Sequence, residues 1–268
     1  MNSSPPVALT IAGSDCSSGA GIQADLKSFQ HFGVFGLTAV SCVVAETSRE
    51  VGGVHPLPPE FLGEQVEMLL RSFPVAAVKT GMLFSAAHVE AACRALEKSG
   101  APVVVDPVMI ASTGDPLIEP DAIDLYRRLL LPRAALITPN LDEAAHLLDA
   151  PIRRREEMVP AARRLAEEFG VPVLLKGGHL EENQCADLLL ESGSEHWFTA
   201  PRIEAPTSHG TGCTFSAAIT AGLALGKPLP EAVGEAKAYL GRALAGGFSW
   251  DDSSGGRIHA LNQGTLGL

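Results

Sequence analysis

The sequence predicts a doubly wound α/β fold, in which helices cover both faces of a mostly parallel central sheet. Three observations lead to this prediction. Short, nearly continuous apolar runs recur along the chain, as expected for strands buried on both faces. A segment of helical period follows most of these runs, which is the pattern of parallel strands joined by crossover helices. Beyond Gly178, two short strand-like segments flank a Ser-Gly turn, which predicts a small antiparallel hairpin at one edge of the sheet.

The expected elements follow in order along the chain. Apolar runs place strands at 7–13, 37–47, 76–82, 102–109, 134–140 and 171–178. Helical periodicity places helices at 20–32, 59–72, 86–99, 120–131, 142–148 and 155–169. The edge hairpin at 187–205 precedes a glycine-rich turn that leads into a helix of small residues at 208–226, and a last helix is expected near 230–245. Without a linker or internal repeat, we expect a single domain over residues 1–268, with a loosely held tail over 249–268.

Composition and charge disfavour several classes of protein. The chain is 46% hydrophobic, yet no apolar run approaches the roughly 18 to 20 residues of a membrane span, so we expect a soluble protein with no membrane partner. With 20 basic and 31 acidic residues, the net charge of −11 argues against nucleic acid as a partner. Five scattered cysteines fit neither a disulfide scaffold nor a structural zinc site, and the N-terminus lacks a signal pattern. We therefore expect a cytoplasmic protein.

The candidate site lies where the strands end, because open α/β sheets bind ligands at the carboxyl ends of their strands. The segments that follow the six apolar runs are polar and rich in glycine: GSDCSSGAGIQAD, AET, KTGM, DPVM, TPNLDEA and KGGH. Ordinary turn chemistry explains any one of them. Six such segments at the same edge of the sheet indicate a ligand site.

The glycine-rich segment His209–Cys213 is the best candidate for an anion site. Its glycines allow successive amide groups to converge, and the helix that follows adds its positive N-terminal dipole. The earlier GSDCSSGAG segment satisfies neither the P-loop nor the dinucleotide-binding pattern. A plain helix N-terminus is the alternative for His209–Cys213. At such a position we expect the thiolate of Cys213 to be favoured, the alternative being a buried, inert thiol.

Seven segments together resemble one family: TIAGSD, GAGIQADLK, VKTGML, VVDPVM, LITPNLDEA, LLKGGH and HGTGCTFSAAI. Over residues 7–245 the chain resembles the hydroxymethylpyrimidine/phosphomethylpyrimidine kinases of thiamine biosynthesis, which are members of the ribokinase superfamily. The resemblance implies a ribokinase-like fold, ATP and Mg²⁺ as cofactors, and a homodimer. The implied reaction transfers the γ-phosphoryl group of ATP to the hydroxymethyl group of 4-amino-5-hydroxymethyl-2-methylpyrimidine, and commonly again to its monophosphate.

The resemblance also implies roles for individual residues. Gly210, Thr211, Gly212 and Cys213 correspond to an anion hole of backbone amides for the transferring phosphoryl group, and the Cys213 side chain is either a base toward the substrate hydroxyl or a group that holds it. Carboxylates that organise Mg²⁺ correspond to Asp106 and Glu143. Contacts to the nucleotide phosphates correspond to Asn140 and Lys176. The pyrimidine pocket corresponds to Gly13, Ala20, Asp25, Met82 and Val108, together with Glu46.

The chain departs from the family pattern at two places. The family typically has a glutamine where this chain has Glu46, and a carboxylate cannot donate a hydrogen bond to an aminopyrimidine unless it is protonated. Many members carry a lysine in the segment that corresponds to residues 108–114, which here reads VMIASTG. The first departure bears on the identity of the substrate. The second bears on phosphate handling and on the second phosphorylation.

Two alternatives to a hydroxymethylpyrimidine kinase remain. A pyridoxine or pyridoxal kinase is the alternative among enzymes, because relatives of this type accept a six-membered aza-ring that bears a hydroxymethyl group. A non-catalytic pyrimidine-binding regulator is the alternative from another class. The presence of Asp106, Glu143 and the GTGC segment argues against the regulator.

Overall fold

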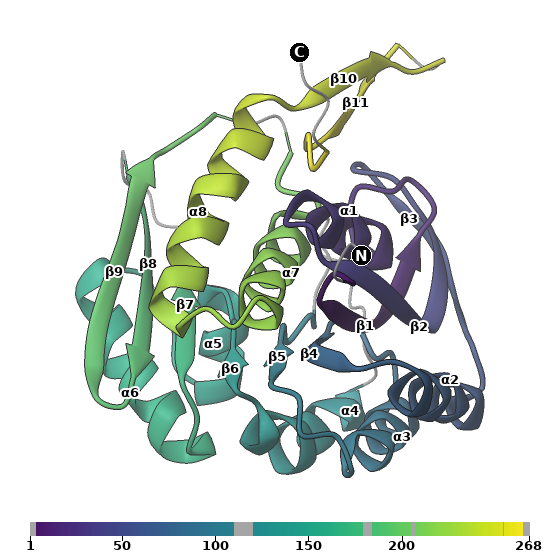
Figure 1. Cartoon of the computed structure of the whole chain (residues 1–268). Helices are drawn as coiled ribbons and strands as arrows, with labels where there is room; N and C mark the ends of the chain where they lie inside the picture. The colour runs from purple at the N-terminus through teal and green to yellow at the C-terminus, as the bar shows by residue number, and fades with distance from the viewer. Residues whose placement is uncertain (1–3, 110–119, 179–183, 205–206, 254, 265–268) are drawn as a thin grey trace.

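A single nine-stranded sheet runs through the part of the chain that the computed structural model describes, namely residues 4–109, 120–178, 184–204, 207–253 and 255–264 (Figure 1). Its strand order is β3-β2-β1-β4-β5-β6-β7-β8-β9. The strands from β2 to β7 in this order pair in parallel, whereas β3 at one edge and β8 and β9 at the other pair antiparallel. The predicted doubly wound sheet and its edge hairpin are confirmed. The strands are Val7–Asp15 (β1), Phe35–Glu46 (β2), Val51–Pro56 (β3), Val75–Thr80 (β4), Val103–Val105 (β5), Leu136–Ile137 (β6), Val173–Lys176 (β7), Gln184–Glu191 (β8) and Ser194–Pro201 (β9).

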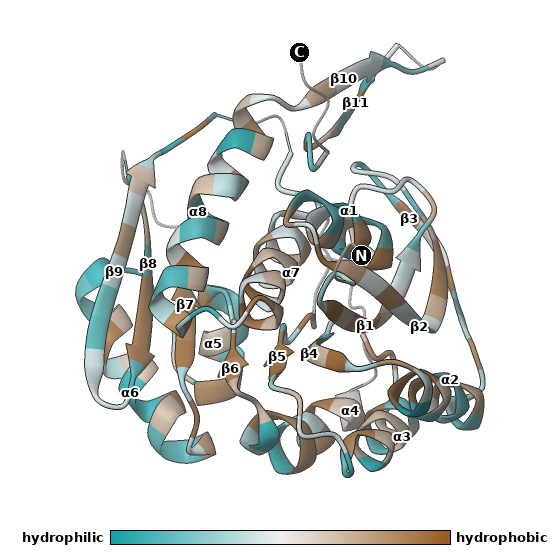
Figure 2. Ribbon diagram, in the orientation of Figure 1, coloured by the Kyte–Doolittle hydropathy of each residue, from teal (hydrophilic) through white to brown (hydrophobic). Residues whose placement is uncertain are grey.

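Helices pack on both faces of this sheet because successive residues of each inner strand point to opposite sides. Val103 and Val105 join the core on one side, and Val104 joins the core on the other. Figure 2 shows apolar colour along the inner strands and a polar surface on the outer helices. The helices are Gly21–His31 (α1), Pro59–Ser72 (α2), Ala86–Leu96 (α3), Pro120–Leu125 (α4), Leu141–Leu148 (α5), Met158–Phe169 (α6), Thr211–Ala224 (α7) and Leu229–Ala245 (α8).

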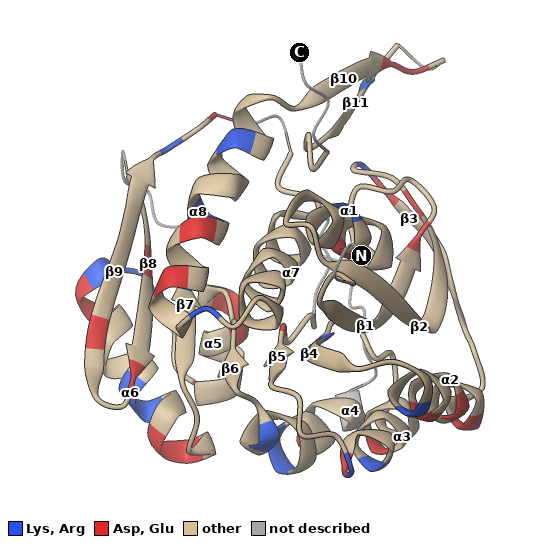
Figure 3. Ribbon diagram, in the orientation of Figure 1, with Lys and Arg blue, Asp and Glu red and all other residues tan. Residues whose placement is uncertain are grey.

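The two helical layers differ in composition. One layer contains α2, α3, α5 and α6, whose apolar stripes pack on the sheet, and Figure 3 shows Lys, Arg, Asp and Glu on these helices. The other layer contains α1, α7 and α8, and α7 is built largely from buried small residues. Because small side chains allow close approach, α7 packs against both α1 and α8 and also lies near β1, β4 and β5. Its N-terminus is thereby fixed over the middle of the sheet.

The order of the strands reverses between β1 and β4. From β1 the chain moves outward to β2 and β3, and it then returns to place β4 on the opposite side of β1. In open α/β sheets, ligands bind above the carboxyl ends of the strands at such a reversal. The fold therefore places the candidate site beside Gly13 at the end of β1 and Thr80 at the end of β4.

Three local features differ from the sequence-based expectations. Strand β3 was not expected, because VGGVHP has two glycines and little apolar alternation; it pairs with the end of β2 as an antiparallel edge. The expected helix at 120–131 begins as α4 and then widens into a π-helical turn at Tyr126–Leu130. Two further short strands, β10 (Phe248–Asp251) and β11 (Arg257–Ala260), form a hairpin that projects from the top of Figure 1.

The expectation of a loosely held tail from Ser249 is wrong for residues 261–263, which lie just after β11. Leu261 and Gln263 are buried, the Asn262 amide donates to the Ala243 carbonyl at 3.0 Å, and the Tyr239 hydroxyl donates to the Gln263 carbonyl at 2.7 Å. Composition indicated a loose end because the segment has few apolar residues. Its docking depends instead on hydrogen bonds to α8, which composition does not reveal. No helix in the described residues has the length and apolarity needed to cross a membrane.

Candidate active site

A cavity of about 720 Å³ lies over the carboxyl ends of the strands, with the N-terminus of α7 at its centre. It collects residues from every strand end that the sequence singled out. All but one of the expected site residues line it: Gly13, Ala20, Glu46, Met82, Asp106, Val108, Asn140, Glu143, Lys176, Gly210, Thr211, Gly212 and Cys213. The exception is Asp25.

The loop before α7 has the geometry of an anion site. Gly210 adopts φ +80°, and a Cβ atom there would lie 1.9 Å from the Gly19 carbonyl oxygen, so only glycine fits. The Gly210 carbonyl accepts from the Thr214 amide at 2.9 Å and starts the helix. Within the described residues, no backbone carbonyl accepts from the amides of Gly212 or Cys213. These amides, at the positive end of a helix of fourteen residues, are available to bind negative charge.

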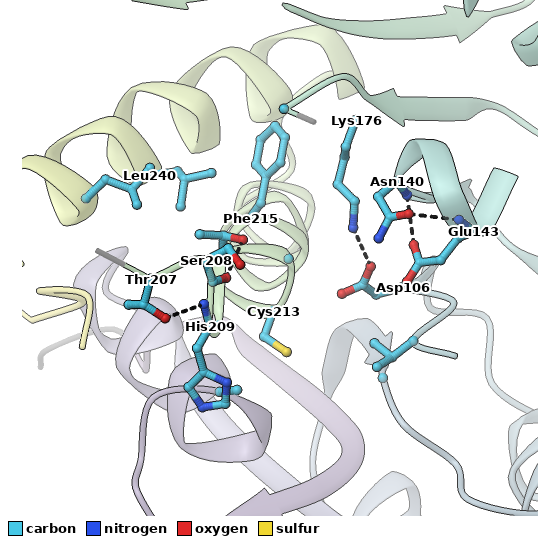
Figure 4. Close-up of a pocket in the computed structure, with 18 of the residues that line it drawn as sticks. Asp106, Asn140, Glu143, Lys176, Thr207, Ser208, His209, Cys213, Phe215 and Leu240 are labelled. Atoms are coloured by element: carbon cyan, nitrogen blue, oxygen red, sulfur yellow. Dashed lines mark hydrogen bonds and ion pairs between the residues drawn. The ribbon is translucent and has the colours of Figure 1, made fainter. Parts of the chain in front are cut away.

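Cys213 does not have the favoured thiolate that its position at a helix N-terminus led us to expect. Burial raises the pKa of its thiol to about 11, and the nearby Lys79 ammonium only partly offsets this effect. Figure 4 shows the sulfur atom directed into the space between His209 and Asp106. At neutral pH the group therefore stays a thiol. The exposed Cys16, rather than Cys213, is the cysteine most accessible to solvent.

Asp106 and Lys176 form the charged side of the cavity. The Lys176 Nζ donates to Asp106 Oδ1 at 2.9 Å (Figure 4). The hydroxyl groups of Thr138 and Ser216 donate to the same carboxylate at 3.0 and 3.1 Å. Burial acts to raise the pKa of Asp106, but the ammonium groups of Lys176 and Lys79 outweigh it and hold the pKa below its usual range. Asp106 is therefore ionised, and Lys176 stays positively charged beside it.

Asn140 and Glu143 are joined in a capping box at the start of α5. The Asn140 side-chain oxygen accepts from the Glu143 amide, and a Glu143 carboxylate oxygen accepts from the Asn140 amide, both at 2.8 Å (Figure 4). The Asn140 NH₂ group is left to contact a ligand. Burial raises the pKa of Glu143 to about 7, although Lys176 opposes the shift, and the negative charge of Asp106 adds to it. The negative charges of Asp106 and Glu143 repel each other, and a cation bound between them would relieve that repulsion.

Asp15 and His209 connect the two loops of the site. Asp15 was missing from the expected site residues, and His209 was expected only as the first residue of the anion segment, with no role of its own. The Asp15 carboxylate accepts from the amides of Ser17, Gly19 and Ala20 and lies 2.9 Å from His209 Nε2. Burial acts to raise the pKa of Asp15, but hydrogen bonds from His209, Ser17 and Ala20 lower it to about 2. The signal in the sequence was an aspartate directly after the first apolar run, in GSD.

Asp25 does not line the cavity. Its carboxylate oxygens both lie 2.8 Å from Lys79 Nζ, and the Thr10 hydroxyl donates to it at 2.6 Å. Both charged side chains of this ion pair are fully buried, and Lys79 lines the cavity. Asp25 thus has a supporting position, in which it holds Lys79. A lysine in the otherwise apolar VAAVKT strand was the sequence signal for a buried pair.

The remaining expected residues form a small pocket at the β1 and β2 side of the cavity. Gly13 belongs there because a Cβ atom would lie 2.9 Å from Cys42 Sγ, and Met82 packs with Cys42 and Val44. Burial raises the pKa of Glu46 to about 7, and the negative charge of Asp15 adds to the shift while His209 opposes it. The segment in which the family's lysine was missing extends into residues 110–119, which lie outside the described residues.

A doubly wound sheet whose cavity holds a helix-terminal anion loop, a charged side and a small apolar pocket defines a small-molecule kinase with the ribokinase-like fold. The sequence matches the family described as phosphomethylpyrimidine kinase over residues 15–257. The chain belongs to the phosphomethylpyrimidine kinase family, which confirms the resemblance found in its sequence motifs.

Curated relatives agree with this assignment. The chain is 45% identical over 240 residues to the hydroxymethylpyrimidine/phosphomethylpyrimidine kinase of Salmonella typhimurium, covering 89% of this chain and 90% of the relative. It is also 45% identical over 237 residues to the thiamine biosynthesis bifunctional protein ThiED of Geobacter sulfurreducens. That match covers 88% of this chain but only 48% of the bifunctional protein.

Solved structures of two kinds share the fold. The pyridoxal kinase of Staphylococcus aureus in complex with ADP superposes with a TM-score of 0.88 at 35% identity, covering 98% of this chain and 94% of that structure. The phosphomethylpyrimidine kinase of Clostridium difficile has a TM-score of 0.78 at 35% identity, covering 88% of this chain and 98% of that structure.

The anion loop generates a first prediction. A Cβ atom at Gly212 would lie 3.3 Å from Lys176 Nζ and 3.5 Å from Asp106 Oδ2, so the further methyl groups of Gly212→Val intrude on the charged side of the cavity. We expect kcat for ATP-dependent phosphorylation to fall about 100-fold or more, because amides aimed at the phosphoryl group are displaced. Product formation and circular dichroism are measured together. Gly100→Ala, which has open space around it, is the control. A folded Gly212→Val protein with wild-type kcat would contradict the assignment of the anion loop.

Proposed function

We propose that this protein is an ATP-dependent kinase of 4-amino-5-hydroxymethyl-2-methylpyrimidine and of its monophosphate, acting in thiamine biosynthesis. The observation that carries the proposal is the position of the anion loop, Gly210–Cys213, between the charged side of the cavity and the Gly13, Glu46 and Met82 pocket. A phosphoryl group bound by the loop can contact a donor on one side and an acceptor hydroxyl on the other. The names of the curated relatives support the same reaction.

In this proposal the residues of the chain act by position and charge. Lys176 and the Asn140 NH₂ group bind the nucleotide phosphates, and the free amides of Gly212 and Cys213 stabilise the charge that develops on the transferring phosphoryl group. The apolar side chains of Leu240 and Leu244, which line the cavity on α8, cover the nucleoside. A Cys213 side chain that stays a thiol is better suited to hold the substrate hydroxyl than to remove its proton.

We propose Mg²⁺ as the cation that accompanies ATP. Asp106 and Glu143 would hold it, directly or through water, and two protein carboxylates suit an ion that keeps several of its waters. Within the described residues, no cluster of three or more His, Cys, Asp or Glu side chains offers a more complete metal site. The raised pKa of Glu143 supports the fit, since a neighbouring cation favours the ionised form of that carboxyl. When bound, Mg²⁺ supplies positive charge that offsets the charge of the phosphates.

A pyridoxal kinase remains the second candidate because pyridoxal kinase structures superpose with TM-scores of 0.87 and 0.88, the first of them bound to AMP-PCP and pyridoxal. Pyridoxal, like the pyrimidine, is a six-membered aza-ring with a hydroxymethyl group. The curated relatives at 42 to 45% identity favour the pyrimidine. The complete catalytic set in the cavity favours an enzyme over a pyrimidine-binding regulator.

We also propose a homodimer in the cytoplasm, where ATP is available. Large apolar side chains are exposed on the adjoining elements β2 and α2 and at the end of α2: Phe35, Val43, Phe61, Met68 and Phe73. The rings of Phe35 and Phe73 stack with their centroids 6.3 Å apart, and exposed large apolar side chains on neighbouring elements are typical of a subunit interface. Light scattering is expected to give about twice the chain mass of 28.0 kDa, and Met68→Glu to give the monomer. A monomeric wild-type protein would contradict the proposed dimer.

A substrate panel tests the proposed reaction. With ATP and Mg²⁺, we expect the pyrimidine and its monophosphate to be phosphorylated with higher kcat/KM than pyridoxine or pyridoxal, and we expect chelation of Mg²⁺ to abolish turnover. ADP release and the phosphorylated product are followed together. A preference for pyridoxal would establish the second candidate, and binding of the pyrimidine without turnover would establish a regulator.

Glu46 generates a prediction about pH. With a pKa of about 7, the Glu46 carboxyl is mostly neutral at pH 6 and can donate a hydrogen bond to a ring nitrogen of the pyrimidine. At pH 8 it is mostly ionised, so a carboxylate lone pair faces the lone pair of the ring nitrogen and no hydrogen bond forms. The glutamine NH₂ group of the Glu46→Gln variant donates a hydrogen bond at both pH values. We therefore expect Glu46→Gln to improve pyrimidine binding more at pH 8 than at pH 6, by up to about tenfold. Calorimetric titration of both proteins with the pyrimidine at pH 6 and pH 8 measures the dissociation constants. If the ratio of the wild-type constant to the Glu46→Gln constant is the same at both pH values, Glu46 shares no proton with the ligand.

A further inference from the structure

Gln263 lies in the docked segment after β11, close to the loops of the active site and far from them in sequence. Only 1% of its surface is exposed. The match to the family model ends at residue 257, before Gln263. Nothing in the family assignment therefore gives this residue a role.

The side-chain amide of Gln263 binds two separate loops. Its Nε2 atom donates to the Gly19 carbonyl at 2.8 Å and to the Thr214 hydroxyl at 2.9 Å. Gly19 belongs to the loop after β1, and Thr214 belongs to the first turn of α7. The two hydrogens of this NH₂ group thus bind one acceptor in the loop after β1 and one acceptor in the first turn of α7.

The bond to Thr214 continues into the anion loop. The Thr214 hydroxyl accepts from Gln263 and donates to the Gly210 carbonyl at 2.7 Å. That carbonyl belongs to the same peptide group as the Thr211 amide, and a Cβ atom on Gly210 would lie 1.9 Å from the Gly19 carbonyl oxygen. Hydrogen bonds through the Gln263 amide, the Thr214 hydroxyl and the Gly210 carbonyl therefore connect the C-terminal segment to the backbone that carries the Gly212 and Cys213 amides.

The oxygen atom of the Gln263 side-chain amide indicates that the two hydrogen bonds donated by Nε2 are the main interactions of this side chain. Its Oε1 atom is buried and has no hydrogen-bond partner among the described residues. A buried unpaired oxygen lowers stability, so an apolar residue of similar size would be the better choice for packing alone. The two hydrogen bonds donated by Nε2 account for an amide at this position.

We propose that Gln263 is a positioning residue, which fixes the first turn of α7 against the loop after β1 and so sets the direction of the amides that bind the transferring phosphoryl group. This inference rests on the proposed kinase function for its kinetic consequence. Its structural part, the ordering of residues 210–214, stands independently of the substrate.

Gln263→Leu tests the proposal, because leucine keeps the apolar bulk and removes both donors. We expect kcat to fall about tenfold or more and KM for ATP to change less than about threefold, since misdirected amides weaken transition-state binding more than ground-state binding. Amide hydrogen exchange at residues 211–214 should become faster. Asn262→Ala is the matched control in the same docked segment and should keep wild-type kcat and exchange.

Gln263→Glu separates positioning from a general loss of packing. The variant keeps the length of the side chain and regains a donor only when the carboxyl is protonated, which burial favours. Its kcat relative to wild type should therefore rise as the pH is lowered from 8 to 6. This second variant also tests the proposal if Gln263→Leu fails to fold.

The outcomes decide between the alternatives. Wild-type kcat in a folded Gln263→Leu protein would overturn the proposal, as would an equal loss of kcat in Asn262→Ala or a Gln263→Glu ratio that does not change with pH. If the wild-type protein phosphorylates neither the pyrimidine nor pyridoxal, the proposed function fails instead. Hydrogen exchange in Gln263→Leu then still measures whether Gln263 orders the loop.

Discussion

The contact between the Asp15 carboxylate and the loops on either side of it is the interaction on which the rest of the site depends. One buried carboxylate accepts three backbone amides of the loop after β1 and meets His209 of the loop before α7. Its donors keep it ionised in spite of burial. The two loops touch so closely at Gly19 and Gly210 that no side chain fits between them. The packing of α7 places its N-terminus over the sheet, and this carboxylate holds the two loops against each other there.

Burial acts on every ionisable group of the cavity, and the hydrogen-bond partners decide the result. Asp15 and Asp106 have several donors and remain charged. Glu46 and Glu143 have fewer, so burial raises the pKa of each carboxyl to about 7. Cys213 is the extreme case, because a thiol binds the surrounding donors weakly and desolvation dominates. The cavity therefore combines fixed charges with groups that can change protonation near neutral pH.

The sequence was sufficient to predict the layers of the fold and the edge of the sheet at which the site lies. Strand ends such as DPVM and KGGH follow strongly apolar runs, and apolar periodicity is a local property of the chain. Features that depend on distant residues were out of reach. Asp25 resembled a substrate contact until Lys79, fifty-four positions away, took both of its oxygens. The docking of Gln263 onto loops at Gly19 and Thr214 leaves no trace in composition, because it consists of hydrogen bonds between segments 49 and 244 positions apart. For Cys213, the sequence indicates a helix N-terminus, whose dipole favours a thiolate, but it does not indicate how deeply the side chain is buried. Burial raises the pKa of the thiol more than the nearby Lys79 ammonium lowers it.

The burial of the charges around the cavity has a consequence for ionic strength. The side chains of Asp15, Asp25 and Lys79 are fully buried, so dissolved salt ions have little access to them. Salt weakens interactions between charges that face solvent and has much less effect on buried pairs. The chain as a whole carries a net charge of −11, which repels an anionic nucleotide at long range. Added salt therefore removes the repulsion on the approach while leaving the field inside the cavity almost unchanged, which is the reverse of the behaviour of an enzyme that attracts its substrate with exposed charge.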